Sequence, residues 1–182
     1  MGRSAASLRI VAGEFGGRRI AGPDGERFRP TAERTREAVF SMLGPVDGDS
    51  VLDLYCGSGA LGFEALSRGA GDLTLVDRAI DLARENAVRL GVGGRCRLHE
   101  DDALGFLGAD DRLYDLVLLD PPYRLADRLG PQLDHLLSER LTPTGRIVVE
   151  SAGAAPMRLS LPLLRERRYG RSLVRIHERE AG

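Results

Sequence analysis

The sequence predicts a doubly wound α/β fold, in which helices cover both faces of a mostly parallel sheet. From residue 50 onward, short apolar runs alternate strictly with segments of helical length. The run at residues 116–119, Leu-Val-Leu-Leu, lacks polar alternation, which is typical of a strand buried on both faces of a parallel sheet. Strands joined by helical crossovers of this length pair in parallel, and each crossover is expected to be right-handed.

Five strands and four helices are expected in this part of the chain. The strands are residues 51–54, 73–77, 96–99, 116–119 and 146–150. The helices are residues 59–67, residues 79–90, a short one from Ala103, and about 125–138. Ligands of such sheets bind outside the carboxyl ends of the strands, so the side chains that follow each strand are the first candidates for a site.

Both ends of the chain predict short antiparallel pairs. Residues 8–21 have the pattern of two short strands around a Gly-rich turn, and residues 163–176 that of two alternating strands joined near Gly170. We therefore divide the chain into an N-terminal tail and β-hairpin, residues 1–28, and a main domain, residues 29–182.

A further helix is expected between the hairpin and the first strand of the main domain. Thr31 is its predicted N-cap, and the Gly-Pro pair at residues 44–45 ends it. Arg29, Arg34 and Arg36 lie near its beginning, where cations oppose the helix macrodipole. This arrangement suggests a bound anion nearby, unless the arginines are solvated.

The composition is that of one globular domain. The chain has 182 residues, of which 42% are hydrophobic, enough for a substantial core. No apolar run approaches the ~20 residues of a membrane-spanning helix, and the first residues contain no apolar signal core. We therefore expect a cytoplasmic protein. Cys56 and Cys96 have no CxxC pair or His pattern beside them, so both are interpreted as buried thiols.

Basic residues are concentrated at the two ends of the chain. Residues 1–36 carry 8 arginines against 4 acids, residues 37–164 carry 12 against 20, and residues 165–182 carry 6 against 3, which sums to the net charge of −1. Every basic residue is Arg, whose planar guanidinium suits phosphate. The basic ends fit a polyanionic partner, and a solvated charged surface explains the same pattern.

A glycine-rich turn follows the first strand of the main domain. Gly57, Gly59 and Gly62 match GxGxxG after a strand and at the start of a helix, where the backbone can approach a nucleoside closely. Asp77, at the end of the next strand, is suited to hold ribose hydroxyls. These features alone fit NAD as well as other nucleoside cofactors.

Carboxylates expected at the carboxyl ends of the strands distinguish between NAD and other nucleoside cofactors. Asp53 precedes the glycines, where it would repel a pyrophosphate and attract an α-ammonium group. Asp102, in the acidic run 100–102, is suited to an adenine amine, and Asp120 adds a further carboxylate. A pocket lined by Asp53, Asp77, Asp102 and Asp120 favours a cationic ligand over a dinucleotide. S-adenosylmethionine, with its sulfonium and ammonium groups, fits these charges.

The sequence Asp-Pro-Pro-Tyr at residues 120–123 predicts a rigid acceptor site. Two prolines fix φ and remove two N–H donors, so the turn is stiff and its carbonyl oxygens have no neighbouring donors. The Asp120 carboxylate and the Pro121 carbonyl can together hold both hydrogens of an exocyclic amine, while Tyr123 offers a face on which a base can stack. An ordinary turn after a strand explains the same residues.

These motifs resemble those of a known family. Residues 53–59, Asp77, the Asp-Ala pair at 102–103 and residues 120–123 are similar to the ordered motifs of S-adenosylmethionine-dependent amino-methyltransferases. Across about residues 8–178, the chain resembles the bacterial 16S ribosomal RNA guanine-N2 methyltransferase D family, and the N-terminal segments carry this likeness. Those segments are residues 9–13, 17–19, 29–31 and 34–40. Ser41 departs from the Asn expected there.

The resemblance implies an enzyme that methylates the exocyclic N2 of guanine 966 in 16S rRNA, acting as a monomer on the small subunit or an assembly intermediate, with no metal. It implies a seven-stranded Rossmann-like sheet whose last strand is antiparallel. The implied catalytic residues are Asp120, Pro121, Pro122 and Tyr123. The implied cofactor residues are Asp53, Tyr55, Gly57, Gly59, Asp77, Arg78, Asp102, Ala103 and Thr31. The implied RNA-binding residues are Arg9, Arg18, Arg19, Arg29, Arg34 and Arg36.

Three alternatives to this activity remain. An adenine-N6 DNA or RNA methyltransferase would use the same turn, although the chain has no separate target-recognition domain. The remaining two are an NAD-dependent oxidoreductase and an RNA-binding protein without activity.

Overall fold

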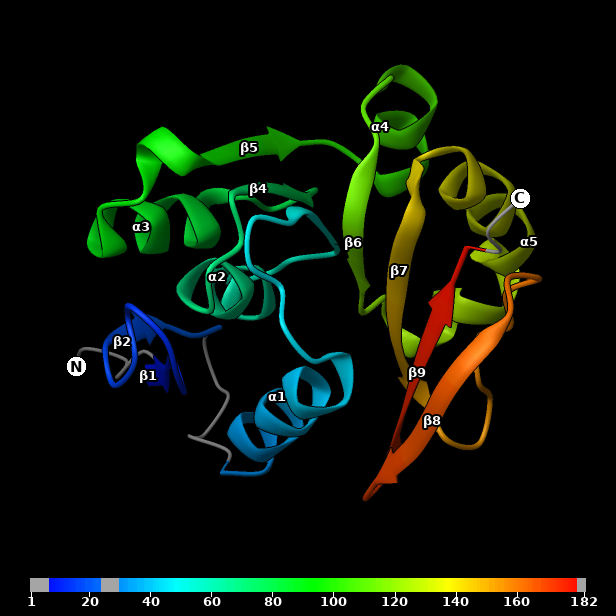
Figure 1. Ribbon diagram of the computed structural model, residues 1–182, viewed down its shortest axis with the longest axis horizontal. Coiled ribbons are helices and arrows are strands. Elements are labelled where there is room, and N and C mark those ends of the chain that lie inside the picture. The colour runs from blue at the N-terminus through cyan, green and yellow to red at the C-terminus, as the bar shows by residue number, and fades with distance from the viewer. Residues whose placement is uncertain (1–6, 24–29, 180–182) are drawn as a thin grey trace.

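The computed structural model describes residues 7–23 and 30–179, and the side chains of these residues apart from 30–32 and 123–128 (Figure 1). Its centre is a seven-stranded sheet in the order β5-β4-β3-β6-β7-β9-β8. The strands are β3 (Ser50–Leu54), β4 (Asp72–Asp77), β5 (Cys96–Glu100), β6 (Tyr114–Leu119), β7 (Leu141–Ala152), β8 (Leu163–Tyr169) and β9 (Ser172–Glu178). The predicted Rossmann-like architecture is confirmed.

The pairing of the strands follows the prediction closely. Strands β5, β4, β3, β6 and β7 are parallel to one another. Strand β9 runs antiparallel to both β7 and β8. The last strand is therefore the antiparallel one, and the terminal hairpin turns at Gly170, whose φ is +57°.

Helices cover both faces of the sheet. Helices α1 (Pro30–Leu43), α2 (Ala60–Ser67) and α3 (Asp81–Leu90) contribute to one core, and α4 (Ala103–Ala109) and α5 (Tyr123–Glu139) to the other. Figure 1 shows the two groups on either side of β6 and β7. A short 3₁₀ helix, η1 (Gly93–Arg95), precedes β5.

The structure explains why residues 116–119 are all apolar. Leu116 and Leu118 pack in the core with α1, α2 and α3, whereas Val117 and Leu119 pack in the core with α4 and α5. All four side chains have no exposed surface. A strand that faces two cores needs apolar side chains at every position.

Several boundaries differ from the prediction, and the clearest differences are in α1, α5 and β7. Helix α1 begins at Pro30, so Thr31 lies inside its first turn and is not the N-cap. Helix α5 begins at Tyr123, directly after the prolines, and contains Pro131. Strand β7 begins at Leu141, five residues before the predicted start at Arg146, because Leu141 already pairs with Tyr114 ahead of a register shift.

The N-terminal hairpin forms a separate two-stranded sheet. Strands β1 (Ser7–Arg9) and β2 (Arg19–Ala21) are antiparallel, with Leu8 opposite Ile20. The hairpin lies beside α2 and α3, away from β8 and β9 (Figure 1). No helix within residues 7–23 and 30–179 is both long and apolar enough to span a membrane.

Candidate active site

A cavity of about 530 Å³ lies at the carboxyl ends of the parallel strands. From β3 the chain builds outward through β4 to β5 and then returns to the other side of β3 for β6 and β7. Ligands of open α/β sheets bind where the strand order reverses in this way. The lining residues are Tyr55, Val76, Asp77, Arg78, Asp101, Asp102, Ala103, Leu104, Asp120, Pro121, Pro122, Leu129 and Glu150.

The turn between β3 and α2 has an unusual backbone. Tyr55 lines the cavity with φ at +59°, and it is the only described residue other than glycine with positive φ. Gly57 and Gly59 follow with φ of +52° and +75°. A Cβ on Gly59 would lie 2.5 Å from the Phe63 ring, so glycine is needed for both conformation and space. The turn is held in one shape before any ligand binds.

Asp77 holds this turn from the neighbouring strand. Its Oδ2 accepts a hydrogen bond from the backbone N–H of Gly57 at 2.9 Å, and its Oδ1 accepts one from Ala79 at 3.0 Å. Each carboxylate oxygen retains acceptor capacity, and Asp77 lines the cavity. It can therefore fix the glycine turn and still accept from the ribose hydroxyls for which it was predicted.

Asp53 lies behind the turn and does not appear in the cavity lining. Its side chain is 2% exposed, and its Oδ2 accepts from the backbone N–H of Gly62 at 2.9 Å. Burial raises the pKa of this carboxyl to about 7; the hydrogen bond from Gly62 opposes the rise, and the charge of Asp77 adds to it. A Cβ on Gly62 would lie 2.9 Å from the same oxygen, so the third glycine lets this carboxyl reach helix α2.

The end of β5 brings a second carboxylate to the cavity. Asp102 is the N-cap of α4, and its Oδ1 accepts from Leu104 and Gly105 at 3.1 and 3.0 Å. Its Oδ2 lies 3.8 Å from a guanidinium nitrogen of Arg78. Burial, together with the charge of Asp102, raises the pKa of Tyr55, so the phenol stays protonated and can donate a hydrogen bond.

The rigid turn lies on the other side of β3. Strand β6 ends at Leu119, and the next three residues, Asp120, Pro121 and Pro122, all line the cavity. Asp120 is exposed there, and Pro121 is buried. The side chain of Tyr123 and that of Thr31 lie outside the described residues.

Sequence reasoning missed two lining residues on this side. Leu129 comes from α5, and Glu150 comes from β7. Glu150 directly ends the apolar run Ile147–Val149, which is the same signal that pointed to Asp120 after residues 116–119. Applying the strand-end rule to every strand would therefore have found it.

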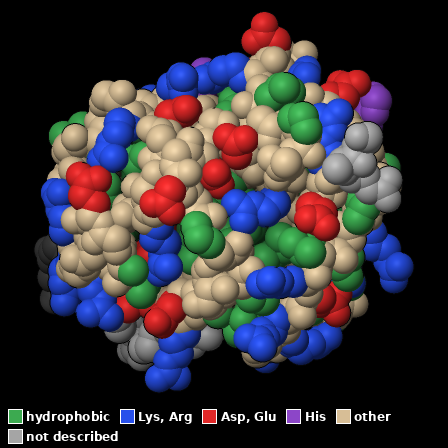
Figure 2. All heavy atoms as spheres, viewed as in Figure 1, with side chains coloured by type: hydrophobic (Ala, Val, Ile, Leu, Met, Phe, Trp, Pro, Cys, Tyr) green, Lys and Arg blue, Asp and Glu red, His purple; other side chains and the backbone are tan. Residues whose placement is uncertain are grey.

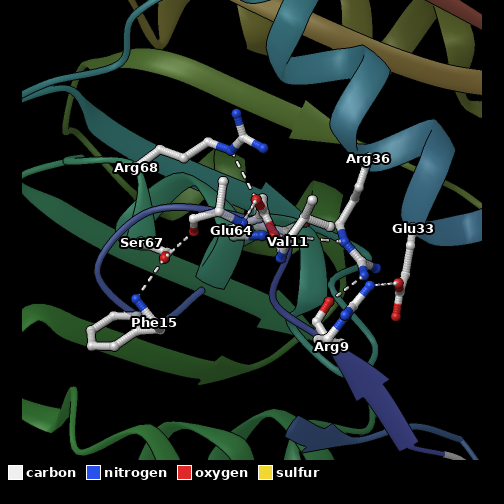
Figure 3. Close-up of polar contacts among 11 residues, drawn as sticks. Arg9, Val11, Phe15, Glu33, Arg36, Glu64, Ser67 and Arg68 are labelled. Carbon is white, nitrogen blue, oxygen red and sulfur yellow. Dashed lines mark hydrogen bonds and ion pairs between the residues drawn. The ribbon is translucent and has the colours of Figure 1, made fainter. Parts of the chain in front are cut away.

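A buried carboxylate fastens the N-terminal segment to α2. Glu64 has no exposed surface and accepts from the backbone N–H groups of Val11 and Ala12 at 2.7 and 3.1 Å, and from Arg68 Nε at 2.8 Å (Figure 3). Arg36 approaches it at 4.0 Å. Backbone donors and two guanidinium groups thus surround one charge.

The predicted RNA-binding arginines fall into different environments. Arg36 is 5% exposed and donates to the carbonyl of Arg9 at 2.9 Å, so its geometry is that of an interior residue (Figure 3). Arg18 donates to the carbonyls of Arg89 and Leu90 at the end of α3, at 2.6 and 3.1 Å. Both side chains hold the hairpin to the main domain.

The remaining arginines of this group lie at the surface. Arg9 is half exposed and pairs with Glu33 at 3.0 Å. Arg19 and Arg34 are exposed, and Arg29 lies outside the described residues. Figure 2 shows basic and acidic side chains interspersed over one face of the molecule. Of the predicted RNA-binding arginines that the structure describes, Arg9, Arg19 and Arg34 are thus the ones at the surface.

Asn86 connects the hairpin with the glycine turn. This fully buried residue of α3 exchanges two hydrogen bonds with the backbone of Ala21, at 2.7 and 2.9 Å. Its amide nitrogen also donates to the carbonyl of Ser58 at 2.9 Å. One side chain thus links β2 to the loop between Gly57 and Gly59, a contact for which the sequence contains no signal.

A Rossmann-like sheet whose acidic strand ends and Asp-Pro-Pro turn face one cavity fits the methyltransferase class. Comparison with known proteins identifies the group within this class. The chain belongs to the family described as Conserved hypothetical protein 95, whose model matches residues 8–178. The resemblance to the small-subunit rRNA methyltransferase D family is also confirmed.

The relatives carry consistent names. The chain is 35% identical to the ribosomal RNA small subunit methyltransferase D of Escherichia coli strain K12, over 96% of this chain and 91% of that protein. It is 36% identical to the putative rRNA methyltransferase YlbH of Bacillus subtilis, over 64% of this chain and 67% of that protein.

Solved structures share the fold over nearly the whole chain. The putative methyltransferase yhhF from Escherichia coli is 34% identical and superposes with a TM-score of 0.83, covering 97% of this chain and 100% of that one. A hypothetical protein of Thermus thermophilus, TTHA0928, is 29% identical with a TM-score of 0.77, covering 94% of this chain and 99% of that one.

Proposed function

We propose that this protein transfers a methyl group from S-adenosylmethionine to the exocyclic N2 of guanine 966 in 16S rRNA. The observation that carries the proposal is a cavity lined both by Tyr55 and Asp77 and by the Asp120–Pro121 turn. A cofactor on one side of β3 and a base on the other would meet within it.

The charges around the cavity suit this cofactor. Asp77, Asp101, Asp102, Asp120 and Glu150 line it, against one arginine, Arg78, among the described lining residues. A cationic sulfonium and ammonium would be attracted there, whereas a dinucleotide pyrophosphate would be repelled. The volume falls within the range of about 300–1,000 Å³ typical of ligand pockets. Asp77 would hold the ribose, and Asp102 would face the adenine.

The turn would act on the nucleophile. S-adenosylmethionine supplies an electrophilic methyl group when bound. A guanine amine is a weak nucleophile because its lone pair is conjugated with the ring. If the Asp120 carboxylate and the Pro121 carbonyl hold its two hydrogens, the lone pair turns out of conjugation and toward the methyl group. The N2–CH3 bond would form as the S–CH3 bond breaks, S-adenosylhomocysteine would be the second product, and the proton lost from N2 would pass to the Asp120 carboxylate. Alignment of this kind supplies much of the acceleration available to a transfer reaction.

The base must leave its stack to reach the cavity. Unstacking costs a few kcal/mol, and the Tyr123 ring would offset part of it by stacking. Arg19 and Arg34 would contact the phosphate backbone. The names of the relatives support small-subunit rRNA as the polymer, and we propose that a monomer acts on it either in the subunit or in an assembly intermediate.

Mapping of modified nucleotides tests the proposal. In a strain that lacks this protein, guanine 966 should lose its N2-methyl group, and purified protein with S-adenosylmethionine should restore it. Methylation that appears at an adenine N6 in place of guanine would point to the alternative activity. Binding of NAD, and not S-adenosylmethionine, in a calorimeter would contradict the class of reaction.

A further inference from the structure

Glu150 lies next to the turn that would hold the target amine. Leu119 of β6 pairs with Val149 of β7, so the following position on the two strands is occupied by Asp120 and Glu150. Both residues line the cavity. Neighbouring strands are about 4.8 Å apart, which places a second carboxylate one strand away from the first.

Glu150 lines the part of the cavity that is proposed to hold the base, not the part proposed to hold the cofactor. Tyr55, Asp77 and Asp102 lie at the ends of β3, β4 and β5, whereas Asp120 follows β6, and Leu129 and Glu150 belong to α5 and β7. Glu150 is partly exposed, and it has no hydrogen bond or ion pair with any other side chain that the structure describes. Its carboxylate is thus available to a ligand on the β7 side of the amine site.

The hydrogen-bonding groups of the purine ring show how a carboxylate at the position of Glu150 could distinguish one base from another. Guanine carries the N1–H donor on one side of its 2-amino group and the N3 acceptor on the other. Adenine has an acceptor at N1. An ionised carboxylate only accepts hydrogen bonds, so a carboxylate beside the held amine matches guanine N1–H and opposes any purine whose N1 is a bare acceptor.

We propose that Glu150 selects guanine by accepting a hydrogen bond from N1–H while Asp120 and the Pro121 carbonyl hold the N2 amine. The inference rests on the proposed function and adds the element that the Asp-Pro-Pro turn lacks, since that turn accepts the amine of guanine and of adenine alike. Glu150 is thereby a specificity residue that touches the substrate.

The test compares two bases that share the 2-amino group and differ in N1–H and the 6-oxo group, and the Glu150 variants isolate the contribution of N1. A 16S rRNA is assembled by ligation with either guanosine or 2-aminopurine riboside at the target position, and is assayed both naked and after assembly with small-subunit proteins. For the wild type, kcat/KM for guanine should exceed that for 2-aminopurine on the order of ten- to a hundredfold, as for other single base-edge contacts.

Two variants report on Glu150. In Glu150→Gln the amide can donate to the bare N1 of 2-aminopurine, so the guanine preference should fall to near unity or invert. In Glu150→Ala no group remains to discriminate, so the preference should fall while transfer to guanine slows. Asp101→Asn removes a charge from the cofactor side of the same cavity and should keep the wild-type preference. Circular dichroism checks that each variant is folded, and calorimetry measures its affinity for S-adenosylmethionine.

The outcomes separate the two proposals. If the wild type transfers no methyl group to guanine N2 in either form of the RNA, the proposed function fails, and the role of Glu150 fails with it. If the wild type methylates guanine but both Glu150 variants keep its preference, the role of Glu150 alone is overturned. A Glu150→Gln variant that loses cofactor affinity and keeps the preference would overturn it equally, by assigning the residue to the cofactor.

Discussion

Glu64 accepts a hydrogen bond from the backbone N–H of Val11 at 2.7 Å, although the two residues lie 53 positions apart in the chain. The carboxylate has no exposed surface, and two arginines approach it. A buried charge that receives backbone donors is stable only while those donors stay in place. Docking of the N-terminal segment and folding of α2 are therefore linked.

We expect Glu64→Gln to destabilise the protein by about 3 to 5 kcal/mol, as when one partner of a buried ion pair is removed. The new amide would also direct two donors at a site already filled with donors. Chemical denaturation measures the loss, and limited proteolysis should cut the N-terminal segment sooner. Glu37→Gln, at an exposed position of α1, is the matched control. Equal stability of the two variants would contradict a supporting role for Glu64.

Asp53 predicts a pH dependence of stability. Its folded-state pKa is raised to about 7 by burial, whereas an unfolded Asp titrates near 3.9. Between these values the folded state keeps a proton that the unfolded state releases, so stability falls as pH rises toward 7 and levels off above it. From pH 5 to pH 8 the free energy of unfolding should drop by about 2 to 3 kcal/mol relative to Asp53→Asn. Parallel stability curves for the two proteins between pH 5 and 8 would show that Asp53 does not titrate in this way.

The residues at the carboxyl ends of the strands could be predicted to form the site because each strand is identified by a short local pattern of apolar residues. Residues 116–119 identify a doubly buried strand by composition alone, and the rule for strand ends then brings Asp77, Asp102 and Asp120 to one cavity. The same rule extended to β7 includes Glu150. These residues are positioned by the topology, which the alternation of strands and helices specifies.

Contacts between distant segments could not be predicted in this way. Arg36 was predicted to bind RNA, yet it is buried and its guanidinium approaches Glu64 at 4.0 Å. Helix α2 is buried almost all round, so hydrophobic periodicity does not mark Glu64 as inward-facing. Asp53 was expected to face the ligand, and its hydrogen bond to Gly62 depends on how α2 packs on β3.

The two sides of the cavity should respond differently to substitution. Asp120→Ala removes an acceptor for the target amine, so we expect kcat to fall roughly a hundredfold or more, a loss typical of a transition-state contact. Affinity for S-adenosylmethionine should change little, because β3, β4 and β5 supply the cofactor side. Unchanged turnover would contradict the proposed role of Asp120.

Asp77→Ala is the reciprocal variant. It leaves the backbone N–H groups of Gly57 and Ala79 without the carboxylate they share, so the glycine turn should loosen and the affinity for S-adenosylmethionine should fall. Calorimetry measures this loss. If Asp77→Ala binds the cofactor as tightly as the wild type does, the glycine turn does not depend on Asp77.

Arg19 separates RNA contact from support of the hairpin. Its side chain is exposed, and its guanidinium donates only to Ser7 among the described residues, at 3.3 Å. Arg19→Ala should therefore weaken RNA binding with little loss of stability, and should reduce the slope of log K against log salt by about 0.7 to 0.9 for each phosphate contact removed.

Two other arginines serve as controls. Arg18→Ala should lower stability too, because it removes the hydrogen bonds that cap the end of α3. Arg97→Ala, which breaks an exposed pair between β5 and Asp72 of β4, should leave the slope unchanged. If Arg19→Ala binds RNA with the wild-type slope, Arg19 is a solvated surface residue and the phosphate contacts lie elsewhere.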